Sequence, residues 1–234
     1  MTIPTTSLGD RARDLILAGV SEIPLPGAAA LSTVLGWYLP SPYQKRLDAF
    51  FADVAKRLER LEKAGTLDLA TLEHNDAFLD AVRAAIDQAA RTADAEKREA
   101  LTSAVTNAAL NVCPDAARRH LFLRRLDEFG PMHLALLRFA SSPAKSAGPS
   151  ISQLAISASL SQALEMAVPA MKGQRELYDQ IWQDLHAAGF VNTSGLHGMM
   201  SISGLNGSRL SELGAGFLAF VTSEPESPSP ATRP

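Results

Sequence analysis

Residues 174–221 read QRELYDQIWQDLHAAGFVNTSGLHGMMSISGLNGSRLSELGAGFLAFV. Apolar residues recur at helical spacing between Gln174 and Ala188, which predicts an amphipathic helix that ends before the following glycine. A loop rich in glycine and serine follows, and a second amphipathic helix is expected from Arg209 to Val221. This stretch therefore predicts a helix, an irregular segment and a closing helix.

The loop between these helices contains a short run, Met199 to Ser203, that we expect to pair with Phe190-Val191 as the strand of a wing. Helix, wing and helix form the second half of a winged-helix domain, where the helix before the wing contacts DNA bases through Arg, Lys, Asn or Gln. Across residues 174–221, however, four acidic residues outnumber two basic ones, which is unfavourable beside DNA phosphates. The module is predicted to be a protein-interaction or structural winged-helix variant, with DNA binding as the alternative.

The composition of the whole chain is that of a globular protein, with 234 residues, a hydrophobic fraction of 46% and a net charge of −3. The acidic balance argues against a constitutive nucleic-acid binder, whose surface is usually basic. A single cysteine, Cys113, excludes an intramolecular disulfide and a zinc site built on several cysteines. Residues 1–10 lack the basic start of a signal peptide, so a cytoplasmic protein is expected.

Residues 15–39, LILAGVSEIPLPGAAALSTVLGWYL, form the most apolar part of the chain. About 20 apolar residues suffice to cross a bilayer, but Glu22, Pro24 and Pro26 interrupt this run. Its second half is rich in small residues and ends in an aromatic pair, which is typical of a tightly packed core helix and also of a helix at a membrane interface. We predict either a core helix or a segment that inserts conditionally into a membrane, centred on Leu31, Val34, Leu35, Trp37 and Tyr38.

Helical periodicity without strand-like alternation extends from Tyr43 to Ala140. Proline, glycine and a capping aspartate divide this region into separate helices. The expected helices run from Tyr43 to Gly65, from Asp76 to Thr92, from Asp94 to Asn111, from Ala116 to Phe129 and from Met132 to Ala140.

The fold class predicted is mainly α, with a helical bundle at residues 1–140 and a winged-helix-like module at residues 151–222 that has at most a small β-wing. Residues 141–150, SSPAKSAGPS, have the composition of a linker. A weakly charged helix is expected from Ile151 to Val168. Residues 223–234 contain no core-forming side chains, and we expect them to be disordered.

The sequence contains no catalytic or metal-binding motif. Its five histidines lack H-E-x-x-H or H-x-x-x-H spacing, so each is interpreted as a surface or cap residue rather than a metal ligand. Cys113 precedes a proline and is interpreted as a structural thiol, with a nucleophile as the alternative. No G-x-S-x-G sequence occurs. We therefore predict no enzymatic activity, no cofactor, no metal and no small-molecule substrate.

Residues 118–125, RRHLFLRR, carry four arginines in two pairs. At about 100° per residue, Arg125 falls within the apolar arc of its helix, and Arg118 lies near the same line one heptad earlier. Arginines beside a core pair with carboxylates or bind an anionic partner. Two interpretations stay open: a salt-bridged scaffold, or an anion or lipid-headgroup site formed by Arg118, Arg119, Arg124 and Arg125.

Four segments follow the apolar N-terminal run in order: PSPYQKRLDAFF, FLRRLDEFGPMHLALLRF, LYDQIWQDLHAAGFV and LSELGAGFLAFV. This pattern resembles a group of uncharacterised bacterial helical proteins, and its layout is distantly similar to the Abi-alpha family associated with abortive infection. The resemblance implies a role in phage defence or stress, and it supplies no catalytic residue.

Together these features predict a non-enzymatic interaction or effector protein that becomes membrane-active through residues 15–39 when triggered. The alternative is a winged-helix DNA-binding transcriptional regulator. A protein partner or self-association is expected, a membrane is a candidate partner, and nucleic acid is the less favoured one. The expected location is the cytoplasm, with membrane association on activation.

Overall fold

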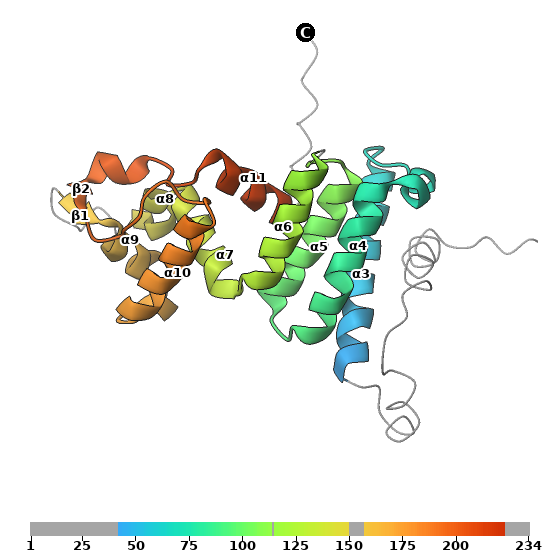
Figure 1. The fold of residues 1–234 in the computed structure, drawn as a ribbon, viewed down its shortest axis with the longest axis horizontal. Helices are drawn as coiled ribbons and strands as arrows, with labels where there is room; N and C mark the ends of the chain where they lie inside the picture. The colour runs from blue at the N-terminus through green and yellow to red at the C-terminus, as the bar shows by residue number, and fades with distance from the viewer. Residues whose placement is uncertain (1–41, 114, 150–156, 223–234) are drawn as a thin grey trace, which may run out of the picture. The chain divides into compact units, whose positions relative to one another are not determined.

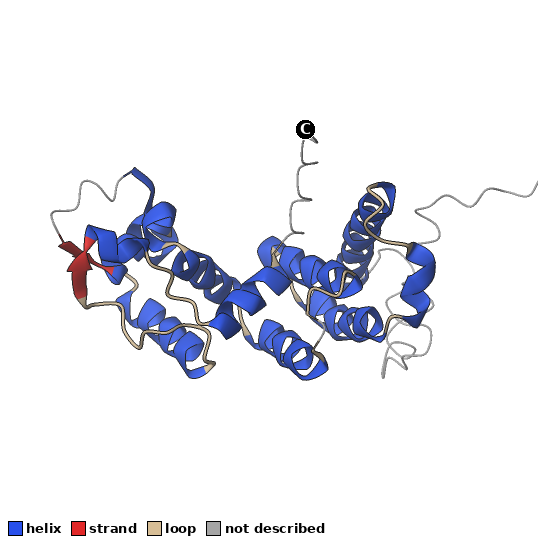
Figure 2. Cartoon of the chain, turned by 90° about the horizontal axis from the view of Figure 1, so that it is seen from above, coloured by secondary structure: helices blue, strands red, loops and turns tan. Residues whose placement is uncertain are grey.

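The computed structural model describes residues 42–113, 115–149 and 157–222. This part of the chain is mainly α-helical with one two-stranded antiparallel sheet, which confirms the helical fold class predicted from the sequence (Figures 1 and 2). The chain divides into two compact units. Unit 1 comprises the described residues up to Asp127 together with those from Phe220 onward, and unit 2 comprises Glu128–Ala219.

Unit 1 is built from long helices that run alongside one another (Figure 1). Its elements are α3 (Pro42–Lys63), η1 (Leu69–His74), α4 (Asp76–Arg91), α5 (Ala95–Ala109) and α6 (Ala116–Glu128). The helices predicted in this region are confirmed to within a few residues at their ends. Asp94 caps α5 as expected, because its carboxylate accepts the Lys97 N–H at 2.8 Å.

Helix α5 is the centre of unit 1, since every residue from Ala100 to Ala109 is buried. Helices α3 and α4 both pack against it, and its alanines allow the close approach that the sequence suggested. The buried hydroxyls of Thr102 and Thr106 donate to carbonyls of their own helix, so they carry no unpaired donor into the core. Burial on all sides explains why α5 shows no amphipathic pattern.

Asn107 ties the end of the described chain to α5. Its side-chain amide donates to the carbonyls of Phe220 at 3.0 Å and Thr222 at 2.8 Å. These carbonyls lie at the C-terminal end of a helix, where no backbone N–H of that helix is left to bond them. The ring of Phe220 also packs on Phe122 of α6, with 5.8 Å between the centroids. Residues 220–222 therefore complete unit 1.

Unit 2 consists of shorter elements joined by longer irregular segments (Figure 2). They are α7 (Pro131–Ser141), α8 (Pro143–Ala147), β1 (Ser157–Ser159), α9 (Leu160–Ala167), η3 (Pro169–Met171), α10 (Arg175–Ala187), β2 (Met199–Ser201), η4 (Ile202–Asn206) and α11 (Glu212–Val221), whose last residues belong to unit 1.

The core of unit 2 is aromatic. Phe190 stacks on Phe217 with 4.8 Å between the ring centroids, and Phe129 meets both rings edge-on. Trp182 is buried and donates its indole N–H to the Thr193 carbonyl at 2.9 Å. These rings come from four separate segments, so the unit depends on contacts between residues distant in sequence.

Gly214 allows α11 to approach this core. A Cβ at this position would lie 2.0 Å from the carbonyl oxygen of Phe190, far inside van der Waals contact. The helix therefore rests directly on the backbone of Phe190, and any side chain larger than hydrogen would force the two segments apart.

Three sequence-based expectations for unit 2 require correction. The predicted wing pairing between Phe190-Val191 and Met199–Ser203 is wrong, because β2 pairs antiparallel with β1 and Val191 forms an isolated bridge with Leu210. Of the helix expected from Ile151 to Val168, residues 151–156 lie outside the described residues, Ser157–Ser159 form strand β1, and helix α9 begins at Leu160 with Ser159 in a capping box. The closing helix begins at Glu212 rather than at Arg209.

Residues 141–150, which have the composition of a linker, contain helix α8 with Pro143 and Ala147 buried. Proline at the first helical turn removes no intrahelical hydrogen bond, so this composition is compatible with a short packed helix. The two compact units divide near Glu128, and the domain boundary at residues 141–150 stays a prediction.

The apolar segment 15–39, with Leu31, Val34, Leu35, Trp37 and Tyr38, lies outside the described residues, as does the tail 223–234. Within the described ranges, no helix has the length and apolar character needed to cross a bilayer.

Candidate functional site

A groove with a volume of about 600 Å³ lies between α4 and α6 in unit 1. We call it the α4–α6 groove. Helix α4 forms one wall, and the opposite wall comes from α6. The lining residues are Asp80, Arg83, Ala84, Asp87, Gln88 and Arg91 from α4, and Ala116, Arg119, His120, Leu123, Arg124 and Asp127 from α6.

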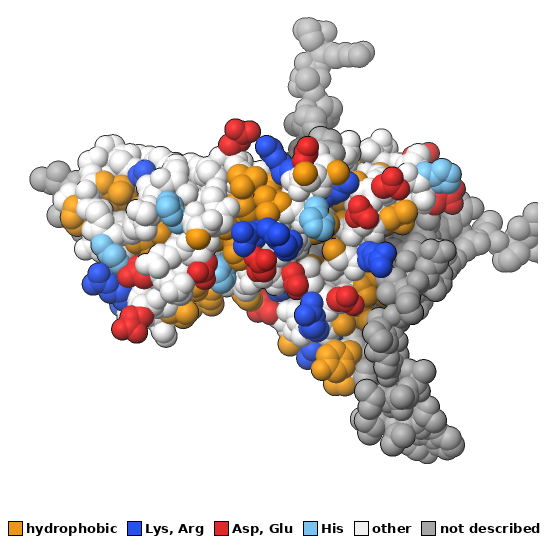
Figure 3. Space-filling view, viewed as in Figure 1, with side chains coloured by type: hydrophobic (Ala, Val, Ile, Leu, Met, Phe, Trp, Pro, Cys, Tyr) orange, Lys and Arg blue, Asp and Glu red, His pale blue; other side chains and the backbone are white. Residues whose placement is uncertain are grey.

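The lining of the groove is strongly charged, with four arginines and one histidine facing three aspartates. Basic and acidic side chains lie close together over α4 and α6 on the molecular surface (Figure 3). The arginines exceed the aspartates by one, so the groove is slightly basic in a chain whose net charge is −3. This local excess favours an anionic group over a cationic one.

Arg91 and Arg119 make contacts that support the walls of the groove. The Arg91 guanidinium lies 3.2 Å from an Asp127 carboxylate oxygen across the groove, in an exposed pair. Arg119 is buried and donates to the Cys113 carbonyl at 3.1 Å, in the connection between α5 and α6. Both contacts hold α6 in place, and we assign these side chains mainly to the framework of the groove.

The other two arginines are exposed and stand on opposite walls, Arg83 on α4 and Arg124 on α6. Arg83 forms no ion pair with any described residue, so its guanidinium is available to an external anion. His120 is also exposed and lines the same groove. Arg83, Arg124 and His120 are therefore the side chains that a bound anion would meet.

A buried lysine supports the wall formed by α6. The ammonium group of Lys97 on α5 donates to the Leu126 carbonyl and reaches the Asp127 carbonyl at 3.4 Å. A cation at the C-terminal end of a helix bonds its last carbonyls and complements the helix dipole. Burial lowers the pKa of Lys97 from 10.5 to about 8, and the nearby Asp127 carboxylate opposes part of this shift.

The structure separates the four arginines of the predicted anion site. Arg119 and Arg124 line the groove, whereas Arg118 and Arg125 do not. Arg118 is exposed in the first turn of α6, where its backbone N–H donates to Asp115 at 2.6 Å. Arg119 is the most buried of the four, although the helical pattern placed Arg125 nearest the core. The prediction of an anion or lipid-headgroup site at these four arginines stays a prediction.

Sequence reasoning missed the contribution of α4, which supplies Arg83 and Arg91. The signal was present, because Arg83, Asp87 and Arg91 recur every four residues and must share one exposed face. It could not show which neighbouring helix this face would meet. That pairing is a property of the tertiary fold.

Among the described residues, no group of His, Cys, Asp and Glu side chains is arranged to hold a metal ion. His133 is a cap residue: its Nδ1 accepts the Gly130 N–H at 3.3 Å, and its ring stacks on Phe129. Burial raises the pKa of the Cys113 thiol, which reduces the thiolate needed for nucleophilic attack. The interpretation of Cys113 as a structural thiol stays a prediction.

Comparison with protein-family models, with curated proteins and with solved structures finds no match to this chain.

Proposed function

We propose that the chain is an interaction protein that binds phosphate-bearing anions in the α4–α6 groove, without catalysis at that site. The observation that carries the proposal is the position of Arg83 and Arg124, two exposed guanidinium groups on opposite walls of one groove. A phosphate group between the walls could accept hydrogen bonds from both guanidiniums, whose planar donor pairs match phosphate oxygens.

The acidic residues in the groove limit the strength of this binding. Asp80, Asp87 and Asp127 lie among the arginines and repel an incoming anion. The groove is open to solvent, so salt screens its attraction within about 8 Å at physiological ionic strength. We therefore expect weak binding to a single phosphate and stronger binding to a surface that presents many phosphates together.

An anionic membrane surface is the partner that we favour. Residues 15–39 of the same chain are apolar, and they would add hydrophobic burial to the electrostatic contact. In this proposal the protein stays in the cytoplasm and contacts the membrane only when activated. A role in phage defence or stress follows from the resemblance stated above and belongs to the same proposal.

Vesicle flotation of the full-length protein tests the groove. Vesicles containing phosphatidylglycerol should carry the wild type upward at low salt, whereas phosphatidylcholine vesicles should not. The double variant Arg83→Gln, Arg124→Gln should reduce flotation at least fivefold. Arg118→Gln is the matched control, because it removes an exposed arginine of α6 that does not line the groove. Equal flotation by the double variant and the control would overturn the groove as the binding site.

Titration with inorganic pyrophosphate separates a free anion from a lipid headgroup. Binding of pyrophosphate that Arg83→Gln abolishes, without flotation on anionic vesicles, would retain the anion site and reject the membrane partner. If neither pyrophosphate nor vesicles bind, the proposed function is wrong.

A winged-helix DNA-binding module is the second candidate function, and the order of elements in unit 2 favours it. Helix α7 precedes β1, helices α9 and α10 follow, and β2 after α10 returns to pair with β1. The exposed face of α10 opposes it, since Arg175 is accompanied by Glu176, Asp179 and Asp184. A gel shift with genomic fragments at about 50 mM salt tests this candidate, and no retarded band would eliminate it.

A further inference from the structure

Three side chains from separate segments of unit 2 form a continuous hydrogen-bonded chain. Ser161 lies in the first turn of α9, Asp179 lies on α10, and His197 lies in the loop before β2. The Ser161 Oγ is 3.2 Å from His197 Nδ1. On the other side of the ring, His197 Nε2 is 2.8 Å and 2.9 Å from the two carboxylate oxygens of Asp179.

The aspartate determines which nitrogen of His197 carries the proton. An ionised carboxylate can only accept hydrogen bonds, so Nε2 must donate to Asp179. In the neutral imidazole Nδ1 is then an acceptor, and the Ser161 hydroxyl donates to it. A serine whose proton is directed at an imidazole nitrogen, with a carboxylate behind the ring, has the arrangement that activates a hydroxyl for nucleophilic attack.

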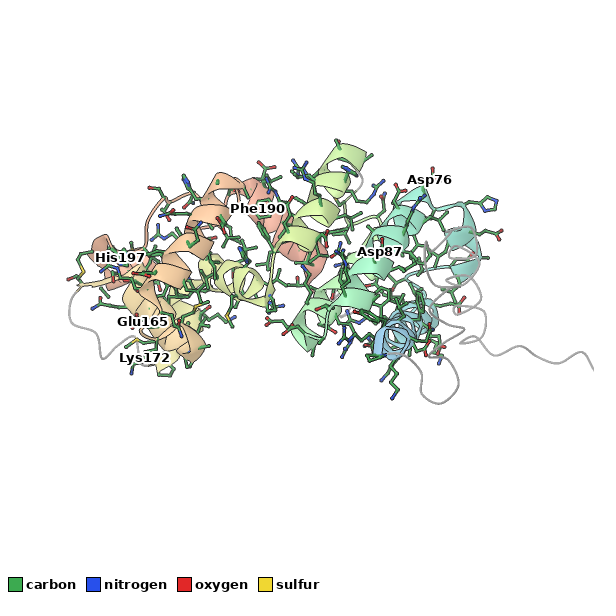
Figure 4. The ribbon with its side chains drawn as sticks, turned by 60° about the horizontal axis from the view of Figure 1, so that its bottom comes forward. Asp76, Asp87, Glu165, Lys172, Phe190 and His197 are labelled. Atoms are coloured by element: carbon green, nitrogen blue, oxygen red, sulfur yellow. The ribbon has the colours of Figure 1, made fainter. Side chains whose placement is uncertain are left out.

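Neighbouring contacts hold this chain in place. The Ser161 backbone N–H donates to the Leu196 carbonyl at 2.9 Å, which fixes the loop residue before His197 against α9. Ser159 Oγ lies 2.8 Å from Ser161 Oγ. The Tyr178 hydroxyl donates to Glu165 at 3.3 Å, and the Tyr178 ring centroid lies 6.2 Å from that of His197. Glu165 and His197 lie in the same part of unit 2 (Figure 4). The Arg175 guanidinium approaches the Asp179 carboxylate at 3.6 Å, one turn earlier on α10.

The exposure of the cluster limits what can react there. The His197 side chain is 37% exposed, whereas Ser161 as a residue is only 8% exposed. A small electrophile in solution can reach the histidine, and it must be slender to reach the Ser161 oxygen beside it. The side-chain amide of Gln162, the next residue, is oriented by accepting the Ser159 N–H at 2.9 Å, and its NH₂ group is a candidate donor to a developing oxyanion.

We propose that Ser161 is a nucleophile activated by His197 as general base, with Asp179 as the positioning residue, and that unit 2 reacts with small acyl or phosphoryl electrophiles. With an activated ester, Ser161 Oγ bonds to the acyl carbon while the bond to the alcohol oxygen breaks. The serine proton passes to His197 Nδ1 and then to the leaving alcohol. Water attacks the acyl-serine in a second step, which releases the acid and restores the hydroxyl.

A small dialkyl fluorophosphate is the probe that tests this proposal on the full-length protein. Ser161 Oγ should form a bond to phosphorus with loss of fluoride, and intact-mass and peptide analysis should locate one adduct at Ser161. Ser161→Ala should abolish the adduct, and His197→Gln should slow labelling at least about 100-fold. The exposed Ser194→Ala is the matched control and should label like the wild type.

The role of Asp179 is tested by a pair of variants that separate chemistry from structure. Asp179→Asn should slow labelling strongly because an amide can donate to Nε2 and so favour the wrong tautomer, whereas Asp179→Glu should restore part of the rate. Circular dichroism must show each variant folded. No adduct at Ser161 in the folded wild type, or equal rates in the wild type and in folded His197→Gln, would overturn the proposal and leave the α4–α6 groove unaffected.

Discussion

In unit 1, helices of 13 to 22 residues surround the buried helix α5, whereas unit 2 is assembled from helices of 5 to 13 residues, a two-stranded sheet and long loops. Both units bury aromatic rings, but in unit 1 they surround the small side chains of α5, whereas in unit 2 the rings of Phe129, Phe190 and Phe217 contact one another directly. Long helices carry an apolar spacing and capping residues that can be recognised in the local sequence. The elements of unit 2 depend more on tertiary contacts. Removing a single contact should therefore lower the free energy of unfolding more in unit 2 than in unit 1.

The largest expected effect is that of Gly214→Ala in unit 2. Replacing glycine with alanine within a helix usually stabilises it by about 1 kcal/mol, but here the new Cβ would lie 2.0 Å from the Phe190 carbonyl oxygen. We expect a loss of about 3 kcal/mol or more. Urea unfolding in a Trp37→Phe background measures it, because Trp182 is then the one tryptophan left.

Gly198→Ala is the control for that substitution, since a Cβ at Gly198 meets no atom within 4 Å. It should change the free energy of unfolding by less than about 0.5 kcal/mol. Equal effects of the two substitutions would contradict the close approach of α11 to Phe190.

In unit 1 the matching test is Asn107→Ala. It removes two donors from the carbonyls of Phe220 and Thr222 and leaves a gap in a buried position. We expect a loss of about 2–3 kcal/mol, measured by urea unfolding followed with circular dichroism. The exposed Asn206→Ala should have almost no effect. A loss as large as that of Gly214→Ala would weaken the contrast between the units.

Lys97 makes the stability of unit 1 depend on pH. Because its pKa is about 8 in the folded protein and near 10.5 when unfolded, unfolding takes up a proton between these pH values. The free energy of unfolding of the wild type should therefore rise with pH in this window, relative to Lys97→Met, by up to about 3 kcal/mol at 1.36 kcal/mol per pKa unit. Denaturation of both proteins at pH 7.5, 9 and 10.5 measures the difference. If the free energies of unfolding of the wild type and Lys97→Met differ by the same amount at all three pH values, the pKa of Lys97 is not lowered in the folded protein.

The smallest expected effects come from the helix caps. Asp94 accepts a backbone N–H at 2.8 Å in unit 1, and Ser159 accepts one at 3.3 Å in unit 2. Asp94→Ala should cost about 1 kcal/mol and Ser159→Ala about 0.5 kcal/mol, because the aspartate bond is shorter and its charge complements the helix dipole. Thermal unfolding compares them. A larger loss for Ser159→Ala would show that the short helix α9 depends on its cap more than expected.

The same contrast explains which parts of the fold could be predicted from the sequence. Helices α3 to α7 were predicted because apolar spacing, capping residues and prolines all mark them locally. The pairing of β1 with β2 could not be predicted, since strands of three residues carry almost no pattern and their partners lie about 40 positions apart. Helix α8 was missed because its composition, with Pro143 and Gly148 at its ends, is also that of a linker.

In the candidate sites, too, local sequence patterns could be predicted, and pairings between distant segments could not. Arg119 and Arg124 were singled out from the sequence as a charged cluster, but the opposite wall with Arg83 depends on the packing of α4 and α6. The cluster of Ser161, Asp179 and His197 has no sequence motif because its members lie 18 residues apart on three different segments. Only the folded chain brings such residues together.

The bonds from Asn107 to the chain at residues 220–222 have a consequence for biosynthesis. Translation makes α3 to α6 first, yet the residues that cover Phe122 and bond the Asn107 amide are made after all of unit 2. The helices of unit 1 thus emerge from the ribosome before unit 2 but gain their last contacts after it, while unit 2 can close as soon as its own residues have emerged. A chain that ends within unit 2 would leave helices α3 to α6 without the contacts of residues 220–222. We expect quality-control proteases to degrade such a chain faster than the full-length protein.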